Sequence, residues 1–221
     1  RRRQRQMCIR DSHKVGMVFQ YPEHQLFEET IAEDIAFGPK NLGLDAEEVD
    51  RRVREAMAFV GLDYDTYAER SPFHLSGGQM RRVAIAGVVA MEPDFLVLDE
   101  PSAGLDPFGR EEIFDEIIKL HKEKDVTVIL VSHNMEDISR MANRLIVLDK
   151  GQIVLDGKPL DIFNHHRHVL QQVGVDVPPV SVLIESLRNR GLDVSNEVLT
   201  VDDAVQAILD CLLYTSDAAD D

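Results

Sequence analysis

Residues 75–106 decide the fold, because three short pieces follow one another there: Leu-Ser-Gly-Gly-Gln at 75–79, Phe-Leu-Val-Leu-Asp-Glu at 95–100 and Ser-Ala-Gly-Leu-Asp at 102–106. The first piece is a glycine-rich turn that opens a helix, and the exposed backbone N–H groups of such a turn favour a phosphate. The second is an apolar strand that delivers Asp99 and Glu100 to its carboxyl end. Two carboxylates at that edge suit a metal ligand followed by a general base.

Two further features lie outside this stretch, namely Gln20 upstream and Ser132-His133 after a second apolar strand at 126–131. Each piece alone is a common loop or turn, but the ordered set of five resembles the ATP-binding-cassette (ABC) ATPases. In the terms of that family, Gln20 resembles the Q-loop glutamine and 75–79 the signature motif. Residues 95–100 resemble the Walker B strand, 102–106 the D-loop, and His133 the switch histidine.

This resemblance implies a role for each matching residue in the binding and hydrolysis of ATP. Asp99 and Gln20 would hold Mg²⁺, Glu100 would act as general base on the attacking water, and His133 would contact the γ-phosphate. Gln20 would also bind the nucleotide and relay its state to the membrane subunit. The resemblance also implies a head-to-tail dimer in which the signature turn of one subunit completes the nucleotide site of the other. The residues that would meet the nucleotide across that seam are Ser76, Gly77, Gly78, Gln79 and Asp106.

The two ends of the chain can be encoded by a single DNA element in opposite orientations. Met-Cys-Ile-Arg-Asp-Ser at 7–12 is encoded by ATGTGTATAAGAGACAG, whose reverse complement reads through Cys-Leu-Leu-Tyr-Thr at 211–215. The element resembles a transposase sequencing adapter. We therefore expect residues 1–12 and 211–221 to be adapter-derived and leave them out of the predicted fold.

Without these ends, the 24 basic and 40 acidic residues become 19 and 36, a net charge of −17. So acidic a surface disfavours binding to nucleic acid or to anionic lipid. Both cysteines, Cys8 and Cys211, fall in the excluded ends, so we expect no disulfide and no thiol chemistry in the remainder. The longest apolar run, 83–91, is far shorter than the ~20 residues of a membrane-spanning helix.

Strand and helix patterns alternate along the chain, which predicts an α/β fold of the P-loop NTPase type with a mainly parallel sheet. The apolar runs 95–98 and 126–131 are typical of strands buried on both faces. A short helix is expected over 30–37, closed by Gly38-Pro39. We predict a partial ABC ATPase domain over 13–163, with a helical subdomain at about 21–90, and a small helical C-terminal extension over 164–210.

The glycine-lysine loop G-x-x-x-x-G-K-[ST], which holds the β- and γ-phosphates in this family, occurs nowhere in the sequence. It should precede Gln20, where the adapter-like residues stand, so we interpret its absence as an N-terminal truncation. The chain as written is therefore predicted not to hydrolyse ATP and to fold poorly. Turnover by the purified chain would refute this prediction.

One branch of the family resembles residues 18–44 closely, together with 79–87 and 132–137. That branch comprises the energy-coupling factor (ECF) or cobalt-type ATPases, which power uptake of vitamins and of cobalt or nickel ions. The resemblance implies three partners: a second ABC ATPase subunit, as homodimer or heterodimer, a transmembrane scaffold and a substrate-binding membrane subunit. It implies a peripheral location on the cytoplasmic face of the membrane. The C-terminal extension would help to hold the two ATPases together.

Three features of the sequence have more than one interpretation. The acidic segment Glu28, Glu29, Glu33 and Asp34 either meets basic residues of the scaffold or forms a solvated helix face. The cluster His165-His166-Arg167-His168 either binds metal or, as we favour, is a solvated helix end. The alternatives to an importer subunit are a soluble ABC ATPase not coupled to transport and a cassette that binds ATP without hydrolysis.

Overall fold

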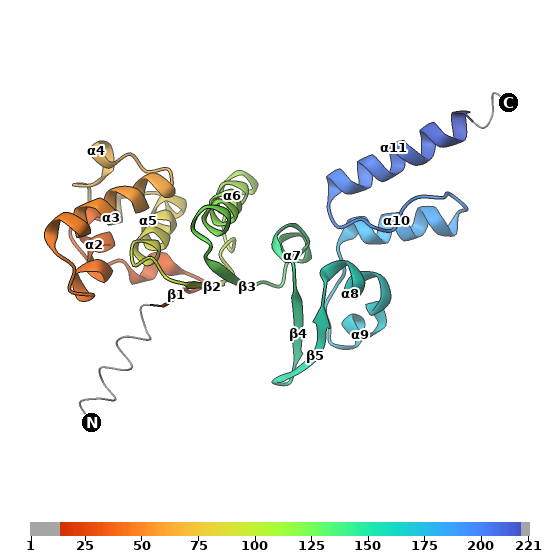
Figure 1. Ribbon diagram of the computed structural model, residues 1–221, viewed down its shortest axis with the longest axis horizontal. Coiled ribbons are helices and arrows are strands. Elements are labelled where there is room, and N and C mark those ends of the chain that lie inside the picture. The colour runs from red at the N-terminus through yellow and green to blue at the C-terminus, as the bar shows by residue number, and fades with distance from the viewer. Residues whose placement is uncertain (1–13, 218–221) are drawn as a thin grey trace. The chain divides into compact units, whose positions relative to one another are not determined.

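The computed structural model describes residues 14–217, with side chains through Leu213, and the adapter-like segment 1–12 lies outside them (Figure 1). The described chain forms two compact units that divide between Val131 and Ser132. The first unit contains a parallel sheet with its helices. The second contains a β-hairpin and the C-terminal helices. The domain bounds 13–163 and 164–210 stay predictions from the sequence.

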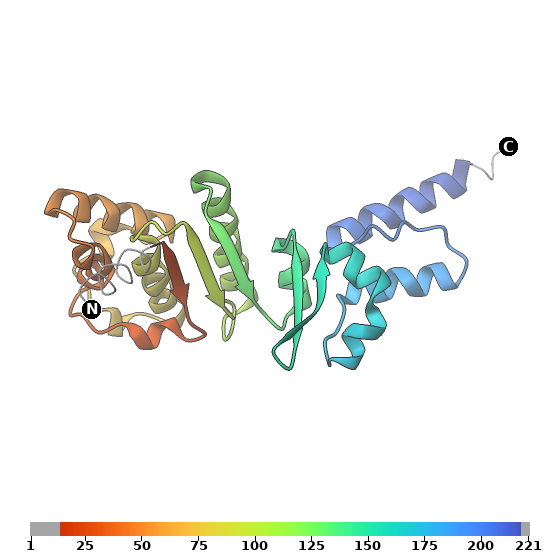
Figure 2. The same ribbon diagram turned by 60° about the horizontal axis from the view of Figure 1, so that its bottom comes forward.

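A three-stranded parallel sheet forms the centre of the first unit, and its strands run side by side in the order β1-β2-β3 (Figure 2). The strands are β1 (Val15–Val18), β2 (Phe95–Asp99) and β3 (Thr127–Val131). Val18 pairs with Leu98, and Asp99 pairs with Val131. The predicted parallel α/β arrangement is confirmed in this unit, and the carboxyl ends of all three strands meet at one edge.

One face of this sheet differs from the prediction that the strands are buried on both sides. Val18, Leu96 and Leu98 are at most 1% exposed, whereas Met17 and Ile129, on the opposite face, are 44% and 49% exposed. The reason is that α5 contacts β1 and α6 contacts β3 on one side only among the described residues. The opposite face is therefore apolar and open in this part of the chain.

Seven helical segments accompany the sheet: six of them fall within the range of about 21–90 that was predicted as a helical subdomain, and α6 follows β2. Their caps follow the sequence signals closely: the side chains of Asp45, Ser76 and Asp106 each accept a hydrogen bond from the backbone three residues on. The segments are η1 (Pro22–Gln25), α2 (Ile31–Asn41), α3 (Ala46–Phe59), α4 (Tyr64–Tyr67), η2 (Pro72–His74), α5 (Gly77–Val89) and α6 (Pro107–Lys124).

Helix α2 is longer than predicted, because it continues through Gly38 and Pro39 to Asn41. Packing explains the difference. A Cβ on Gly38 would lie 2.7 Å from Met91 Cγ, so the glycine lets the last turn of α2 approach the chain after α5 closely. Pro39 is buried in that contact region. The helix ends instead before Gly43, whose φ of 78° suits glycine.

Helix α5 is the central element of the first unit. It contacts α2, α3, η1 and β1, and its residues Val83 and Ala86 are fully buried. Gly16 of β1 allows the strand to approach this helix, since a Cβ there would lie 2.6 Å from Val88 Cγ1. The residues before and after α5 are therefore positioned by one well-packed helix.

The second unit begins with α7 (Met135–Met141) and an antiparallel hairpin of β4 (Leu145–Asp149) and β5 (Gln152–Gly157). Helix α8 (Pro159–His165) contacts β5 and α7, and the short α9 (Arg167–Gln172) follows it. The histidine cluster at 165–168 thus spans the junction of α8 and α9, with His165 and His168 exposed.

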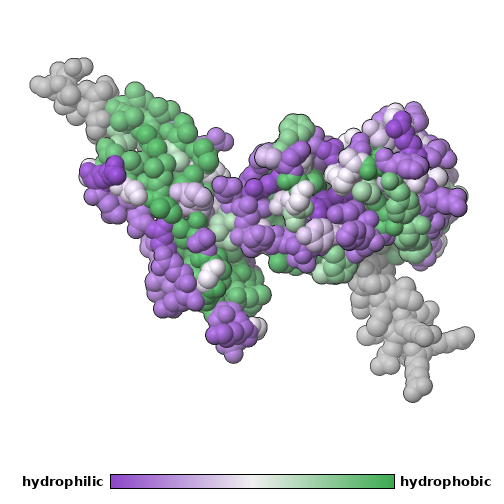
Figure 3. Space-filling view, turned by 180° about the vertical axis from the view of Figure 1, so that it is seen from behind, coloured by the Kyte–Doolittle hydropathy of each residue, from purple (hydrophilic) through white to green (hydrophobic). Residues whose placement is uncertain are grey.

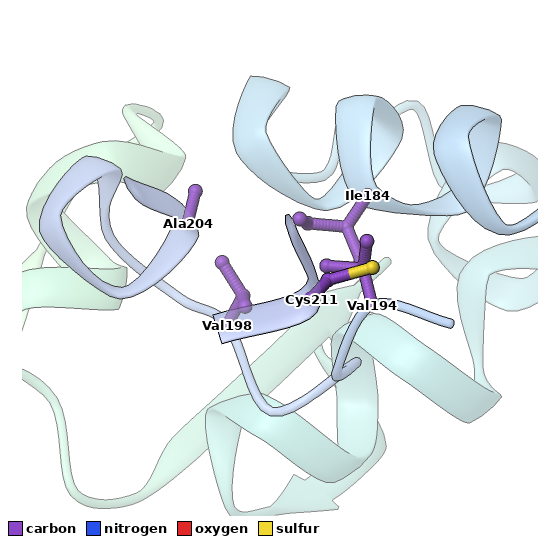
Figure 4. Packing of buried hydrophobic residues seen from close by; sticks show 5 residues of the cluster. All are labelled: Ile184, Val194, Val198, Ala204 and Cys211. Atoms are coloured by element: carbon purple, nitrogen blue, oxygen red, sulfur yellow. The ribbon is translucent and has the colours of Figure 1, made fainter. Parts of the chain in front are cut away.

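Two helices, α10 (Pro179–Asn189) and α11 (Val201–Asp217), end the described chain. Ile184 of α10 packs with Val194, Val198, Ala204 and Cys211 in a small core of their own (Figure 4). Helix α11 therefore continues into the segment 211–221 that we left out of the predicted fold, and Cys211 is buried in this core. The adapter origin of that segment stays a prediction about its DNA.

The outer face of α11 is apolar. Val201, Val205 and Leu209 follow one another at intervals of four residues and are between 48% and 64% exposed, as are Leu212 and Leu213. Figure 3 shows this hydrophobic surface beside the grey C-terminal atoms.

Candidate functional site

The glycine-rich turn at 76–79 forms a complete capping box. Ser76 Oγ accepts from the Gln79 N–H over 3.3 Å, and Gln79 Oε1 accepts from the Ser76 N–H over 3.1 Å. Gly77 is exposed, and a Cβ there would meet nothing within 4 Å. The first turn of α5 therefore has a bare backbone surface, which a phosphate or a second protein can approach closely.

The end of β2 delivers Asp99 and Glu100, both half-buried, to the edge of the sheet. Glu100 has a φ of 48°, in the left-handed region that non-glycine residues rarely occupy. Its N–H donates to Val131 O over 2.9 Å, so the pairing of β2 with β3 fixes this conformation. Such backbone strain is concentrated at functional sites, which supports the special role predicted for Glu100.

The register of the sheet brings Gln20 to the same edge. Gln20 lies two residues after Val18, and Glu100 lies two residues after Leu98, the partner of Val18 in the ladder. The Gln20 side chain is exposed. The order of the strands thus places the predicted Q-loop and the end of the Walker B strand on adjacent strand ends.

Asp106 is the N-cap of α6, as its sequence position before Pro107 predicts. Its Oδ1 accepts from the Gly109 N–H over 2.7 Å. One carboxylate oxygen is therefore engaged within its own chain, and a contact across a subunit seam would use the other.

His133 belongs to the second unit and stands exposed before Asn134, the N-cap of α7. Ser132 Oγ accepts from the Asn134 N–H over 3.0 Å and so orders this turn. His133 lines an open groove of ≈ 1080 Å³ together with residues of α9 and α10. Of the predicted site residues it alone lies in this unit, and the other eight lie in the first.

Arg81 is not among the predicted site residues, yet it lies between the predicted motifs of the first unit. Only 2% of Arg81 is exposed, and its guanidinium reaches the carbonyl oxygens of Gln20 and Pro101. The residue type did not predict burial, because arginine on a helix is exposed far more often than buried. One signal in the sequence could have pointed to Arg81: it lies one turn after Gly77, between the signature motif and the Walker B strand, which the predicted site must bring together.

Comparison with known proteins agrees with this geometry. Residues 2–103 match the family model described as ABC transporter. The chain is 56% identical over 199 residues to the energy-coupling factor transporter ATP-binding protein EcfA2 of Clostridium perfringens, covering 90% of this chain and 70% of the relative. It is 51% identical over 206 residues to the protein of that name from Caldanaerobacter subterraneus, covering 93% and 71%.

Two solved structures share the fold. The first, cbiO1 from Clostridium perfringens, described as part of the ABC transporter complex cbiONQ, has a TM-score of 0.66 and 34% identity over 80% of this chain and 69% of its own. The second, the ATP-binding cassette MJ0796 in a dimeric post-hydrolysis state with ADP and Pi, has a TM-score of 0.57 and 30% identity over 66% and 62%.

The fold and the site define an ABC-type ATP-binding cassette. Within that class, the chain belongs to the energy-coupling factor transporter ATP-binding proteins. The predicted fold class and family are thereby confirmed, and the chain is a member of a family of ATP-binding ATPases. Among the helices that the structure describes, none combines the length and apolar character needed to cross a membrane.

Proposed function

We propose that the protein encoded by the gene of residues 13–210 is the ATP-binding subunit of an ECF-type importer of vitamins or of cobalt or nickel ions, which it energises by hydrolysing ATP. This chain itself, whose sequence holds no G-x-x-x-x-G-K-[ST] loop, stays predicted not to hydrolyse ATP. The observation that carries the proposal is the 56% identity to a relative named as an ECF transporter ATP-binding protein. The site supports it, because the predicted motifs of the first unit are all positioned by one sheet edge and by α5.

Asp99 and Gln20 are the proposed ligands of Mg²⁺. They fit that ion, since Mg²⁺ takes one or two protein oxygens and keeps water and phosphate oxygens for its other positions. No cluster of three or more histidine, cysteine or acidic residues that could hold a metal occurs in the described part of the chain. Bound there, Mg²⁺ would neutralise charge on the phosphates of ATP.

Glu100 is the proposed general base. The left-handed backbone turns the chain sharply directly after β2, so the carboxylate stands at the sheet edge beside Asp99. There it would orient a water molecule and accept its proton as the water attacks the γ-phosphate. His133, from the second unit, is the proposed contact to that phosphate.

The signature turn is proposed to act on the nucleotide of a second ATPase subunit. In its open first turn the backbone N–H groups of Gly77 and Gly78 would face an anion, whereas those of Ser76 and Gln79 are engaged in the capping box. Ser76 and Gln79 would shape the turn at the partner's nucleotide, and Asp106 would meet the partner across the same seam. ATP that contacts both subunits favours the closed dimer, and hydrolysis releases it.

The start of α2 is the proposed contact to the transmembrane scaffold, on the cytoplasmic face of the membrane. Phe27 and Phe37 are exposed and pack edge to face at 4.8 Å between ring centroids, and Glu33 is exposed beside them. Asp34 is not part of this surface, contrary to our expectation. It is 8% exposed and accepts from the N–H groups of Phe27 and Glu28, so it fixes the preceding loop.

One experiment tests catalysis in the complete product of the gene that encodes residues 13–210, called the complete subunit below. Glu100→Gln is expected to lower ATP turnover by about 10²–10⁴-fold, the usual contribution of a general base. It should also trap ATP-bound dimers. If turnover is unchanged, Glu100 is not the base. If the unaltered complete subunit binds ATP and shows no turnover, the cassette only binds.

A second experiment tests coupling to transport. Gln20→Ala and Glu33→Lys in the complete subunit should each reduce co-purification with a membrane scaffold encoded beside its gene. Glu47→Lys, on an exposed part of α3, is the control for the charge change. Unaltered assembly of both test variants would favour the alternative of a soluble ABC ATPase that is not coupled to transport.

A further inference from the structure

Arg81 is a buried cation in the second turn of α5, one turn after Gly77, and only 3% of its side chain is exposed. A guanidinium removed from water is costly unless hydrogen bonds and an opposite charge replace its hydration. The groups that replace the water around Arg81 belong to three different segments of the first unit.

The first partner segment is 101–103, at the start of the predicted D-loop. Arg81 Nη1 donates to Pro101 O over 3.0 Å and also to Ala103 O. Both carbonyls lie just after Glu100, in the turn in which the Ala103 N–H donates back to Glu100 O over 3.1 Å. The guanidinium therefore holds the backbone that leaves the proposed general base.

The other two partner segments are the Q-loop and η1. Arg81 Nη2 donates to Gln20 O over 3.2 Å, and Arg81 Nε lies 3.5 Å from Glu23 Oε2. Within the described residues, this buried Glu23 oxygen accepts no hydrogen bond. The contact with η1 is thus an ion pair without a well-formed hydrogen bond, and it is looser than the contact with Pro101.

We propose that Arg81 is a positioning residue that couples the signature turn directly to the D-loop and the Q-loop and, through Glu23, to η1. One rigid planar group spans all three segments, so a displacement of α5 at the nucleotide is passed to both loops. Because the pair with Glu23 is looser than the other contacts of Arg81, η1 is the segment whose response to ATP can be separated from that of the two loops. The inference rests on the proposed function, because ATP is what displaces the signature turn.

The test compares Arg81→Gln, Arg81→Lys and Glu23→Gln in the complete subunit, with and without Mg-ATP. Hydrogen exchange is followed at 20–25 and 101–106, together with steady-state ATP turnover. We expect Arg81→Gln to lose ATP-dependent protection in both segments. Its kcat should fall by about 10²-fold, as expected for displaced catalytic groups, with little change in KM.

The two other variants separate charge from geometry. Arg81→Lys keeps the charge without the planar fork and should recover only part of the protection. Glu23→Gln should keep ATP-dependent protection at 101–106 and lose it at 22–25, since Arg81 still donates to Gln20 O.

Arg52→Gln is the matched control, because Arg52 of α3 also donates to two carbonyls, those of Ala90 and Met91 just after α5, and pairs with Glu92. It should lower stability and leave the ATP-dependent protection intact. Arg81→Gln with wild-type protection and kcat would overturn the inference, as would equal losses in Arg52→Gln. An unaltered subunit with neither turnover nor ATP-dependent protection would refute the proposed function, and the inference with it.

Discussion

The N–H of Glu100 donates to the carbonyl oxygen of Val131 over 2.9 Å, one residue beyond the last paired position of β2. This hydrogen bond holds Glu100 at a φ of 48°, so the strand ends in a sharp turn that the following residues, 101–103, continue. The proposed general base thus occupies a strained backbone position that the sheet itself maintains.

Replacement of Glu100 should separate stability from activity. Glu100→Gly removes the left-handed strain and is expected to leave the free energy of unfolding unchanged or higher by up to about 1 kcal/mol, without ATP turnover. Glu100→Val should lower it by about 1–3 kcal/mol, since a β-branched residue is disfavoured there. Urea unfolding checks both values. Equal stability of the two variants would contradict a strained backbone.

Gly77, in the bare first turn of α5, gives a second prediction that separates stability from function. A Cβ on Gly77 meets nothing within 4 Å, so Gly77→Ala should fold normally and gain up to about 1 kcal/mol of helix stability. In the complete subunit, however, the added methyl group occupies the surface proposed for the partner's nucleotide. ATP-driven dimerisation, measured by light scattering, is therefore expected to fail.

Gly43→Ala is the control for this variant. Gly43 has a φ of 78° and open space around it, so alanine there should cost about 1 kcal/mol in strain and leave dimerisation intact. A Gly77→Ala subunit that dimerises with ATP as the unaltered one does would remove the signature turn from the proposed seam.

Local chemistry explains which parts of the structure were predictable. The caps at Ser76 and Asp106 depend on residues three or fewer positions apart, so the sequence signals for α5 and α6 were sufficient. The predicted end of α2 was wrong, because the observed end depends on packing against Met91, which is more than fifty residues from Gly38 in the chain. Long-range packing of this kind leaves no local pattern.

In the candidate site, too, local sequence signals were predictive and long-range contacts were not. Family motifs predicted roles for Asp99, Glu100 and His133, which stay predictions, and the apolar run before Asp99 was sufficient to predict that the first two follow a strand. The buried positions of Arg81 and Asp34 could not be predicted, because both residue types are usually exposed and both are satisfied by backbone groups of other segments.

A tight contact between β1 and α5 gives a third prediction. In Gly16→Ala the new methyl group would lie 2.6 Å from Val88 Cγ1 and 3.0 Å from Pro93 Cγ. Overpacking of this kind should lower the free energy of unfolding by about 1–3 kcal/mol. Chemical denaturation measures the loss. The double variant with Val88→Ala removes the closest atom and should recover part of the stability, and no recovery would contradict this steric account.

Glu48 in the first turn of α3 gives a prediction about acid stability. Its carboxylate accepts from Arg51 over 2.6 and 2.8 Å and from Arg52 over 2.7 Å, and these hydrogen bonds lower its pKa from 4.5 to about 2. A carboxyl group with a lowered pKa stabilises the folded state above its unfolded pKa. That contribution is fully present above pH 4.5 and disappears as the pH falls toward 2.

Glu48→Gln should therefore flatten the dependence of stability on pH between 4.5 and about 2, the two values between which Glu48 titrates on unfolding. Denaturation midpoints measured at intervals of pH across this range check the slope. Glu47→Gln, one residue away on an exposed side chain, controls for the loss of one negative charge from the same turn. If both variants change the slope equally, the arginine pairs of Glu48 are not its cause, and net charge alone governs acid unfolding here.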